Sequence, residues 1–161
     1  MARANGLDPF AMYSVFKTAF DQVNKFKAER NLLAAHVLAF SILEDRVTAA
    51  YVSAYRLLHE KNPPQYENLG KIHFKNKVSN LHNMGVIDQS LDEKINAAAI
   101  LRNELTHEMM WRLDCFTEEG LDEIRDLINQ VNKANRRFVK NQNEKRKEIA
   151  FRSDSKKLKK N

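Results

Sequence analysis

The chain has 161 residues, of which 43% are hydrophobic and 30% are charged, and its formal net charge is +6; this length corresponds to one domain with a hydrophobic core. Only four glycines and three prolines occur, which excludes architectures with many tight turns and favours helices. One cysteine excludes a disulfide framework, and since the sequence has neither an apolar run of about 18 residues nor a signal-peptide core, we expect a cytoplasmic protein without a membrane segment.

Two helices are predicted before Pro63 and Pro64. Asp8 and Pro9 form a helix start, because Asp caps a helix and Pro suits its first position. An apolar stripe then continues to about Lys27, typical of a face turned to the core rather than a platform for bases. The second helix is expected from near Asn31 to about Lys61, ahead of two prolines. Its expected apolar positions are Leu33, Val37, Phe40, Leu43, Val47, Ala50, Tyr51, Ala54 and Leu58.

Two further helices are predicted in the middle of the chain. The third is expected from about Leu69 to Met84, with Gly85 as its C-terminal cap. Ser90 and Glu93 fit a capping box that starts the fourth helix. The positions expected to face inward in this fourth helix are Ile95, Ala98, Leu101 and Leu105.

The last predicted helix starts at Thr117 and leads into a basic segment. Its expected apolar stripe is Leu121, Ile124, Leu127 or Ile128, Val131 and Phe138. Residues 132–161 contain 12 Lys+Arg and 3 Asp+Glu, a net charge of +9, whereas the other residues carry −3. We therefore predict a bundle over residues 1–140 and a basic, disordered tail over 141–161. The basic segment, residues 132–161, is either a solvated helix end or an arm that contacts phosphates, and Arg136, Arg137 and Lys140 are its candidate contacts.

The stretch from Ile100 to His107 carries the main chemical signal. Asn103 and His107 are four residues apart, so they lie nearly one above the other on a helix. Arg102 is about 140° round the axis from His107, a gap that its long side chain can close. A cation, an amide and a group that titrates near neutrality then converge, as proton transfer beside a phosphate requires.

This stretch resembles the R-polar-x-x-x-H motif of the HEPN superfamily, through Arg102, Asn103 and His107. The resemblance extends over roughly residues 31–131, through an ordered series. The members of that series are Leu69-Gly70-Lys71, Lys77-Val78, Met84-Gly85-Val86-Ile87, a capped helix and Leu101 to His107. The resemblance implies an all-α fold, a bundle of four to five mostly antiparallel helices.

The resemblance also implies a function, that of a metal-independent endoribonuclease of toxin or phage-defence type. His107 would be the general acid or base, Arg102 would stabilise the transition state, and Asn103 would orient the His or the phosphate. RNA, a second copy of the chain in a homodimer and an antitoxin protein are the implied partners. Glu44 and Asp45 either face solvent or place one carboxylate beside Arg102. Because HEPN-like proteins often have an acidic residue in this helix, Glu44 is the candidate supporting residue.

Alternatives remain open at this point. Mannitol-repressor-type domains share the same helical series, so a non-catalytic regulatory or protein-interaction module is the second hypothesis. A third is that Arg102 only pairs with a carboxylate and His107 only satisfies a helix end. Lys71 and Lys75 share a face of the predicted third helix and either line a phosphate groove or are simply solvated. The remaining histidines are scattered without metal-ligand spacing, so neither a metal nor another cofactor is expected.

Overall fold

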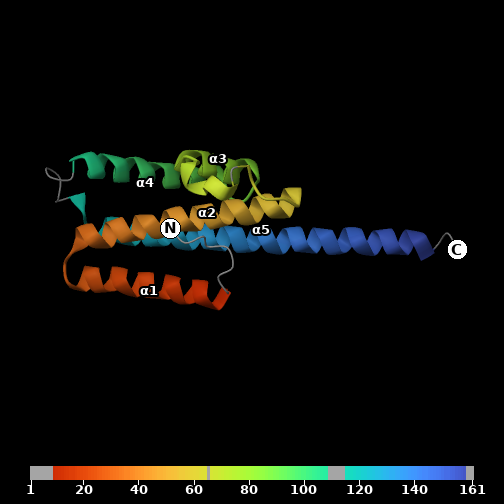
Figure 1. The fold of residues 1–161 in the computed structure, drawn as a ribbon, viewed down its shortest axis with the longest axis horizontal. Coiled ribbons are helices and arrows are strands. Elements are labelled where there is room, and N and C mark those ends of the chain that lie inside the picture. Colours follow the sequence, from red (N-terminus) through yellow and green to blue (C-terminus); the bar gives the residue numbers. More distant parts are fainter. Residues whose placement is uncertain (1–8, 65, 109–114, 159–161) are drawn as a thin grey trace. The chain divides into compact units, whose positions relative to one another are not determined.

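The computed structural model describes residues 9–64, 66–108 and 115–158, and among their side chains those of 15–64, 68–103, 115–149 and 151. The helices are α1 (Pro9–Ala28), α2 (Leu32–His59), the 3-10 helix η1 (Tyr66–Lys71), α3 (Phe74–Asn83), α4 (Gln89–Glu108) and α5 (Glu118–Leu158). Within these described ranges no strand occurs, and the predicted all-α helical bundle is confirmed (Figure 1). No helix in the described part of the chain combines the length and apolar content needed to cross a bilayer.

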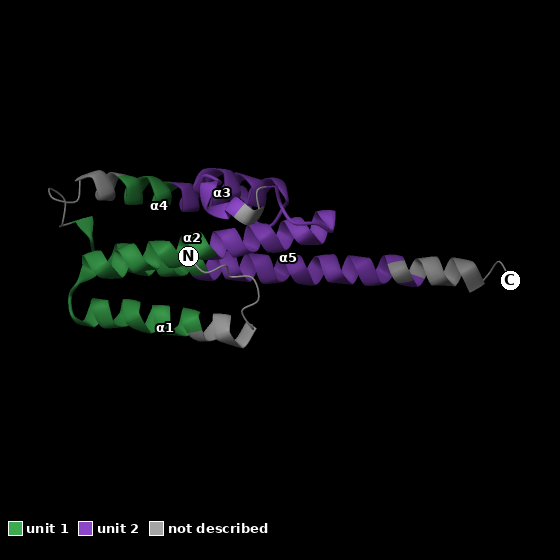
Figure 2. Cartoon of the chain, in the orientation of Figure 1, with its two compact units in different colours: residues 1–45, 97–128 green, residues 46–96, 129–161 purple. Residues whose placement is uncertain are grey.

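The chain divides into two compact units (Figure 2). Unit 1 contains residues 1–45 and 97–128, and unit 2 contains residues 46–96 and 129–161. The helices α2, α4 and α5 each contribute residues to both units. The candidate motif belongs to unit 1, whereas the whole basic segment, residues 132–161, belongs to unit 2.

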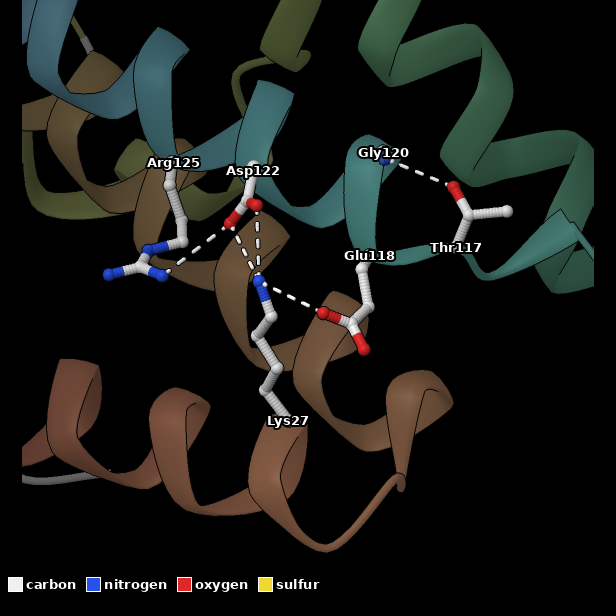
Figure 3. Close-up of polar contacts among 6 residues, drawn as sticks. All are labelled: Lys27, Thr117, Glu118, Gly120, Asp122 and Arg125. Carbon is white, nitrogen blue, oxygen red and sulfur yellow. Dashed lines mark hydrogen bonds and ion pairs between the residues drawn. The ribbon is translucent and has the colours of Figure 1, made fainter.

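A polar cluster joins α1 to the start of α5 in unit 1 (Figure 3). The Lys27 ammonium lies 3.1 Å from both carboxylate oxygens of Asp122 and 3.4 Å from Glu118. The hydrogen bond to Asp122 and the charge of both carboxylates raise the pKa of Lys27, although partial burial opposes this. The cation is in the last turn of α1 and Glu118 is in the first turn of α5. Both positions are favoured by the helix dipoles.

The predicted last helix is confirmed over its apolar stripe. Thr117 accepts a hydrogen bond from the Gly120 N–H at 3.1 Å, which is the expected N-terminal cap (Figure 3). The predicted stripe is buried, namely Leu121, Ile124, Leu127, Ile128, Val131 and Phe138. The helix continues to Leu158 instead of ending near residue 140, although residues 143–149 are all exposed. A separate function for residues 141–161 stays a prediction.

The predicted third helix is wrong in its first turns. Residues 66–71 form η1, within which Asn68 has non-helical angles, and α3 begins only at Phe74. Gly70 has a low helix propensity, so nothing local holds this stretch in an α-helix. Gly85 does end α3 as expected, with a φ of +71° in the left-handed region where glycine has no steric cost.

The start of α4 and parts of two apolar stripes also differ from expectation. Asp88, rather than Ser90, caps α4, because its Oδ1 accepts the Leu91 N–H at 2.9 Å. Three side chains expected to face inward are exposed, namely Val37 and Leu58 of α2 and Leu101 of α4. The core positions of α2 from Phe40 to Ala54 are buried as predicted.

Candidate functional site

The motif lies on the C-terminal part of α4, which stays helical through Glu108. Asn103 and His107 therefore occupy successive turns of one helix, as the sequence predicted. The Asn103 side chain is exposed. The side chain of His107 lies outside the described residues, so the distances between its imidazole and its neighbours stay a prediction.

Arg102 is held against α2 by Glu44. Its Nη1 donates to Glu44 Oε1 at 2.7 Å, the short distance expected of a charge-assisted hydrogen bond. The side chains are 43% and 36% exposed, respectively. One of the two alternatives raised for Glu44, an ion pair with Arg102, is therefore present in unit 1.

The reason that Glu44 rather than Asp45 meets Arg102 is the rotation of α2. Leu43 and Val47 are buried in the core, and they fix which side of the helix faces inward. Glu44 lies at the edge of that buried face and is half-buried, whereas Asp45, about 100° further round, is exposed. The pairing holds Nη1 against α2 while 43% of the side chain stays exposed, so an anion can approach it.

Two exposed apolar residues immediately precede this arginine in α4. Ile100 is 59% exposed and Leu101 is 43% exposed. Val37, on the part of α2 that belongs to the same unit, is also exposed. Exposed large apolar groups beside a charged site are typical of a surface that another molecule covers.

The other basic candidates lie in unit 2. Lys71 ends η1 and Lys75 belongs to α3, so the single helix face that they were predicted to share does not exist. Both side chains are exposed. Arg136, Arg137 and Lys140 are exposed on α5, and Lys140 lies 3.9 Å from Glu144.

His36 is a buried histidine that the sequence gave no reason to single out. Its Nδ1 is 2.8 Å from the Leu32 carbonyl oxygen, and its ring meets Phe116 edge-on with centroids 5.3 Å apart. Burial lowers the pKa of His36, although the backbone hydrogen bond acts in the opposite direction. The ring is packed in the core of unit 1, which favours the neutral imidazole.

A basic hollow is the feature that sequence reasoning missed. It lies in unit 2 at the end of α2 and includes Arg146 of α5. The only signal for it in the sequence was the general excess of Lys and Arg after residue 131. Among the described residues, no group of three or more His, Cys, Asp or Glu is placed to hold a metal ion.

No family model, curated protein or solved structure matches this chain. The function must therefore be inferred from the residues and their geometry.

Proposed function

We propose that the protein is a metal-independent endoribonuclease of HEPN type, which cuts RNA by attack of a 2′-hydroxyl on the adjacent phosphate. The observation that supports this most is the state of Arg102, which Glu44 fixes at one oxygen while 43% of the side chain stays exposed. An anchored guanidinium loses less conformational freedom when it binds a phosphate. Asn103 and His107 follow it on the same helix.

The proposed reaction uses one cation and two proton transfers. A base takes the proton of the 2′-hydroxyl as its oxygen bonds to phosphorus, and an acid gives a proton to the departing 5′-oxygen. The products are a 2′,3′-cyclic phosphate and a new 5′-hydroxyl. His107 would serve as acid or base, Arg102 would stabilise the charge of the transition state, and Asn103 would orient the imidazole or the phosphate.

One motif provides one imidazole, whereas the reaction needs both an acid and a base. A homodimer that brings two copies of the motif together supplies the second group. Exposed Ile100 and Leu101 beside Arg102 support this arrangement, because a second copy would remove their apolar surface from water. The expected assembly is a dimer whose interface includes this end of α4.

The direct test is to incubate purified protein with mixed RNA in EDTA and to identify the chemical ends of the fragments. We expect cleavage that leaves 2′,3′-cyclic phosphates, and His107→Ala should abolish it. His73→Ala is the matched control, since His73 is exposed and makes no side-chain cap bond at the start of α3. Cleavage by His107→Ala at the wild-type rate would refute the mechanism.

A second candidate is a non-catalytic regulator resembling mannitol-repressor-type domains, and the same ion pair favours it. If the bond from Arg102 to Glu44 only ties α4 to α2, the arginine has no further role. The exposed apolar residues Val37, Ile100 and Leu101 would then contact a protein partner. A wild-type protein that leaves every RNA intact in the assay above would favour this candidate.

A further inference from the structure

A hollow of about 530 Å³ opens in unit 2 where α2 ends. It is lined by side chains from the last turn of α2, from the loop that follows and from α5. These residues are Arg56, Glu60, Lys61, Asn62 and Arg146. With three cations and one carboxylate, the lining carries a net positive charge.

Contacts within the protein hold both arginines of the hollow in position. Arg146 Nη2 donates to the Leu57 carbonyl oxygen at 2.5 Å and to Glu60 Oε1 at 3.3 Å. Arg56 Nε donates to Asn62 Oδ1 at 2.8 Å. The Arg146 side chain is nevertheless 48% exposed. Its guanidinium is therefore oriented in advance and still accessible from solvent.

Beyond the hollow, α5 carries further cations, with Glu144 and Glu148 interspersed among them. Lys145 and Lys147 flank Arg146 in the chain and are exposed, and Lys61 at the rim is exposed as well. The last carbonyls of α2 would repel an anion, but Arg146 binds one of them and so offsets that repulsion. Planar guanidinium groups together with flexible lysines are the usual ligands of a phosphate backbone.

We propose that this hollow binds the phosphate backbone of an RNA strand, with Arg146 and Lys61 contacting phosphates and α5 extending the contact. The choice of RNA rests on the proposed function, but the hollow and its charge do not. A purely structural reading is that Arg146 only caps the end of α2. The two readings differ for Lys61, whose side chain forms no hydrogen bond or ion pair among the described residues. Its loss should affect RNA binding only if the hollow contacts phosphates.

The test measures binding apart from cleavage. The probe is a fluorescein-labelled 12-nucleotide RNA with 2′-O-methyl groups throughout, which cannot be cut by 2′-hydroxyl attack. Its affinity for the full-length protein is measured by fluorescence polarisation between 50 and 200 mM salt. Lys61→Gln is compared with Lys94→Gln, an exposed lysine of α4 in the same unit, so that both variants lose one charge.

We expect Lys61→Gln to weaken binding about fivefold at 0.1 M salt and to reduce the slope of log affinity against log salt by about 0.7, as for one lost phosphate contact. Lys94→Gln should change the affinity less than twofold. Arg146→Gln should weaken binding at least as much as Lys61→Gln. The melting temperature of the Arg146→Gln variant shows whether the loss of binding comes from a loss of stability.

Three results would overturn the proposal. They are an unchanged affinity and slope for Lys61→Gln, an equal loss for both lysine variants, and a wild-type protein that does not bind the probe. None of these bears on cleavage, which is decided separately with unmodified RNA. Conversely, tight binding that depends on Lys61 would stand even if the protein cut no RNA.

Discussion

Replacing Glu44 with Gln separates a structural role of the ion pair from a role in positioning Arg102. The substitution keeps the size and one oxygen acceptor but removes the charge that holds Arg102 Nη1 at 2.7 Å. Because the side chains are 43% and 36% exposed, the pair is screened by water and should contribute less than about 1 kcal/mol to the free energy of unfolding. For a chain of this size that corresponds to a melting temperature lowered by about 2–4 °C or less.

The effect on cleavage should be much larger than the effect on stability. If Glu44 fixes the guanidinium at the reacting phosphate, its loss lets Arg102 leave the productive position, and a displacement of about 1 Å can cost a hundredfold in rate. We expect kcat/KM to fall between about tenfold and a hundredfold, which is roughly 1.4–2.7 kcal/mol of transition-state stabilisation. Most of the fall should be in kcat rather than KM.

The assay is the initial rate of cleavage of a fluorogenic RNA in EDTA, run beside a thermal melt followed by circular dichroism. Asp45→Asn is the matched control, because it removes the same charge from the next residue of α2, which is exposed. Equal rates for Glu44→Gln and Asp45→Asn would refute the positioning role. A Glu44→Gln variant that loses several kcal/mol of stability would show instead that the pair is mainly structural.

Three further predictions concern stability. Since burial lowers the pKa of His36 below its ordinary value of 6.5, the unfolded chain takes up a proton before the folded one does. The free energy of unfolding should therefore fall as the pH falls below about 6.5, by at most roughly 1.4 kcal/mol per pH unit. Urea midpoints measured from pH 5 to 8 should show this fall for the wild type and a smaller one for His36→Gln. Gly85→Ala should lower the free energy of unfolding by about 1–2 kcal/mol, because its φ is +71° while no atom crowds the new Cβ. Gly70→Ala is equally uncrowded and has no positive φ, so it should not destabilise the fold. Equal decreases in melting temperature for the two variants would contradict the reasoning. Ending the chain after residue 144 should lower the melting temperature more than ending it after Glu148, because only the shorter chain loses the two Arg146 bonds; equal melts would show that these bonds contribute nothing.

The parts of the fold that could be predicted from the sequence are those set by local chemistry. The stripe of α5 recurs at the helical period from Leu121 to Phe138, and each of its positions is buried. Thr117 and Gly85 mark a helix start and a helix end because a hydroxyl cap and a left-handed turn are local requirements. Each of these features follows from a pattern within one helix or at its ends.

The parts that could not be predicted depend on contacts between segments far apart in the chain. The bond from Arg102 to Glu44 joins residues 58 apart, and the bond from Arg146 to the Leu57 carbonyl joins residues 89 apart. The apolar stripe of α2 puts Glu44 nearer the buried face than Asp45, but it does not show which helix packs beside Glu44. Leu101 has the spacing of the inward stripe of α4 but is exposed. The spacing shows which residues share one face of the helix, but it does not show whether another segment covers that face.

The structure places two arginines in the same kind of environment. Arg102 bonds to Glu44, and Arg146 bonds to the Leu57 carbonyl and Glu60, so each is held against α2 while 43% and 48% of its side chain stay exposed. An arginine held in this way has already lost part of its rotamer freedom, so less is lost when a phosphate binds. Replacing either with lysine would keep the charge but lose the planar fork. Such a change should therefore reduce the affinity or rate at any salt concentration, whereas removal of an exposed lysine such as Lys147 should act mainly through the salt dependence.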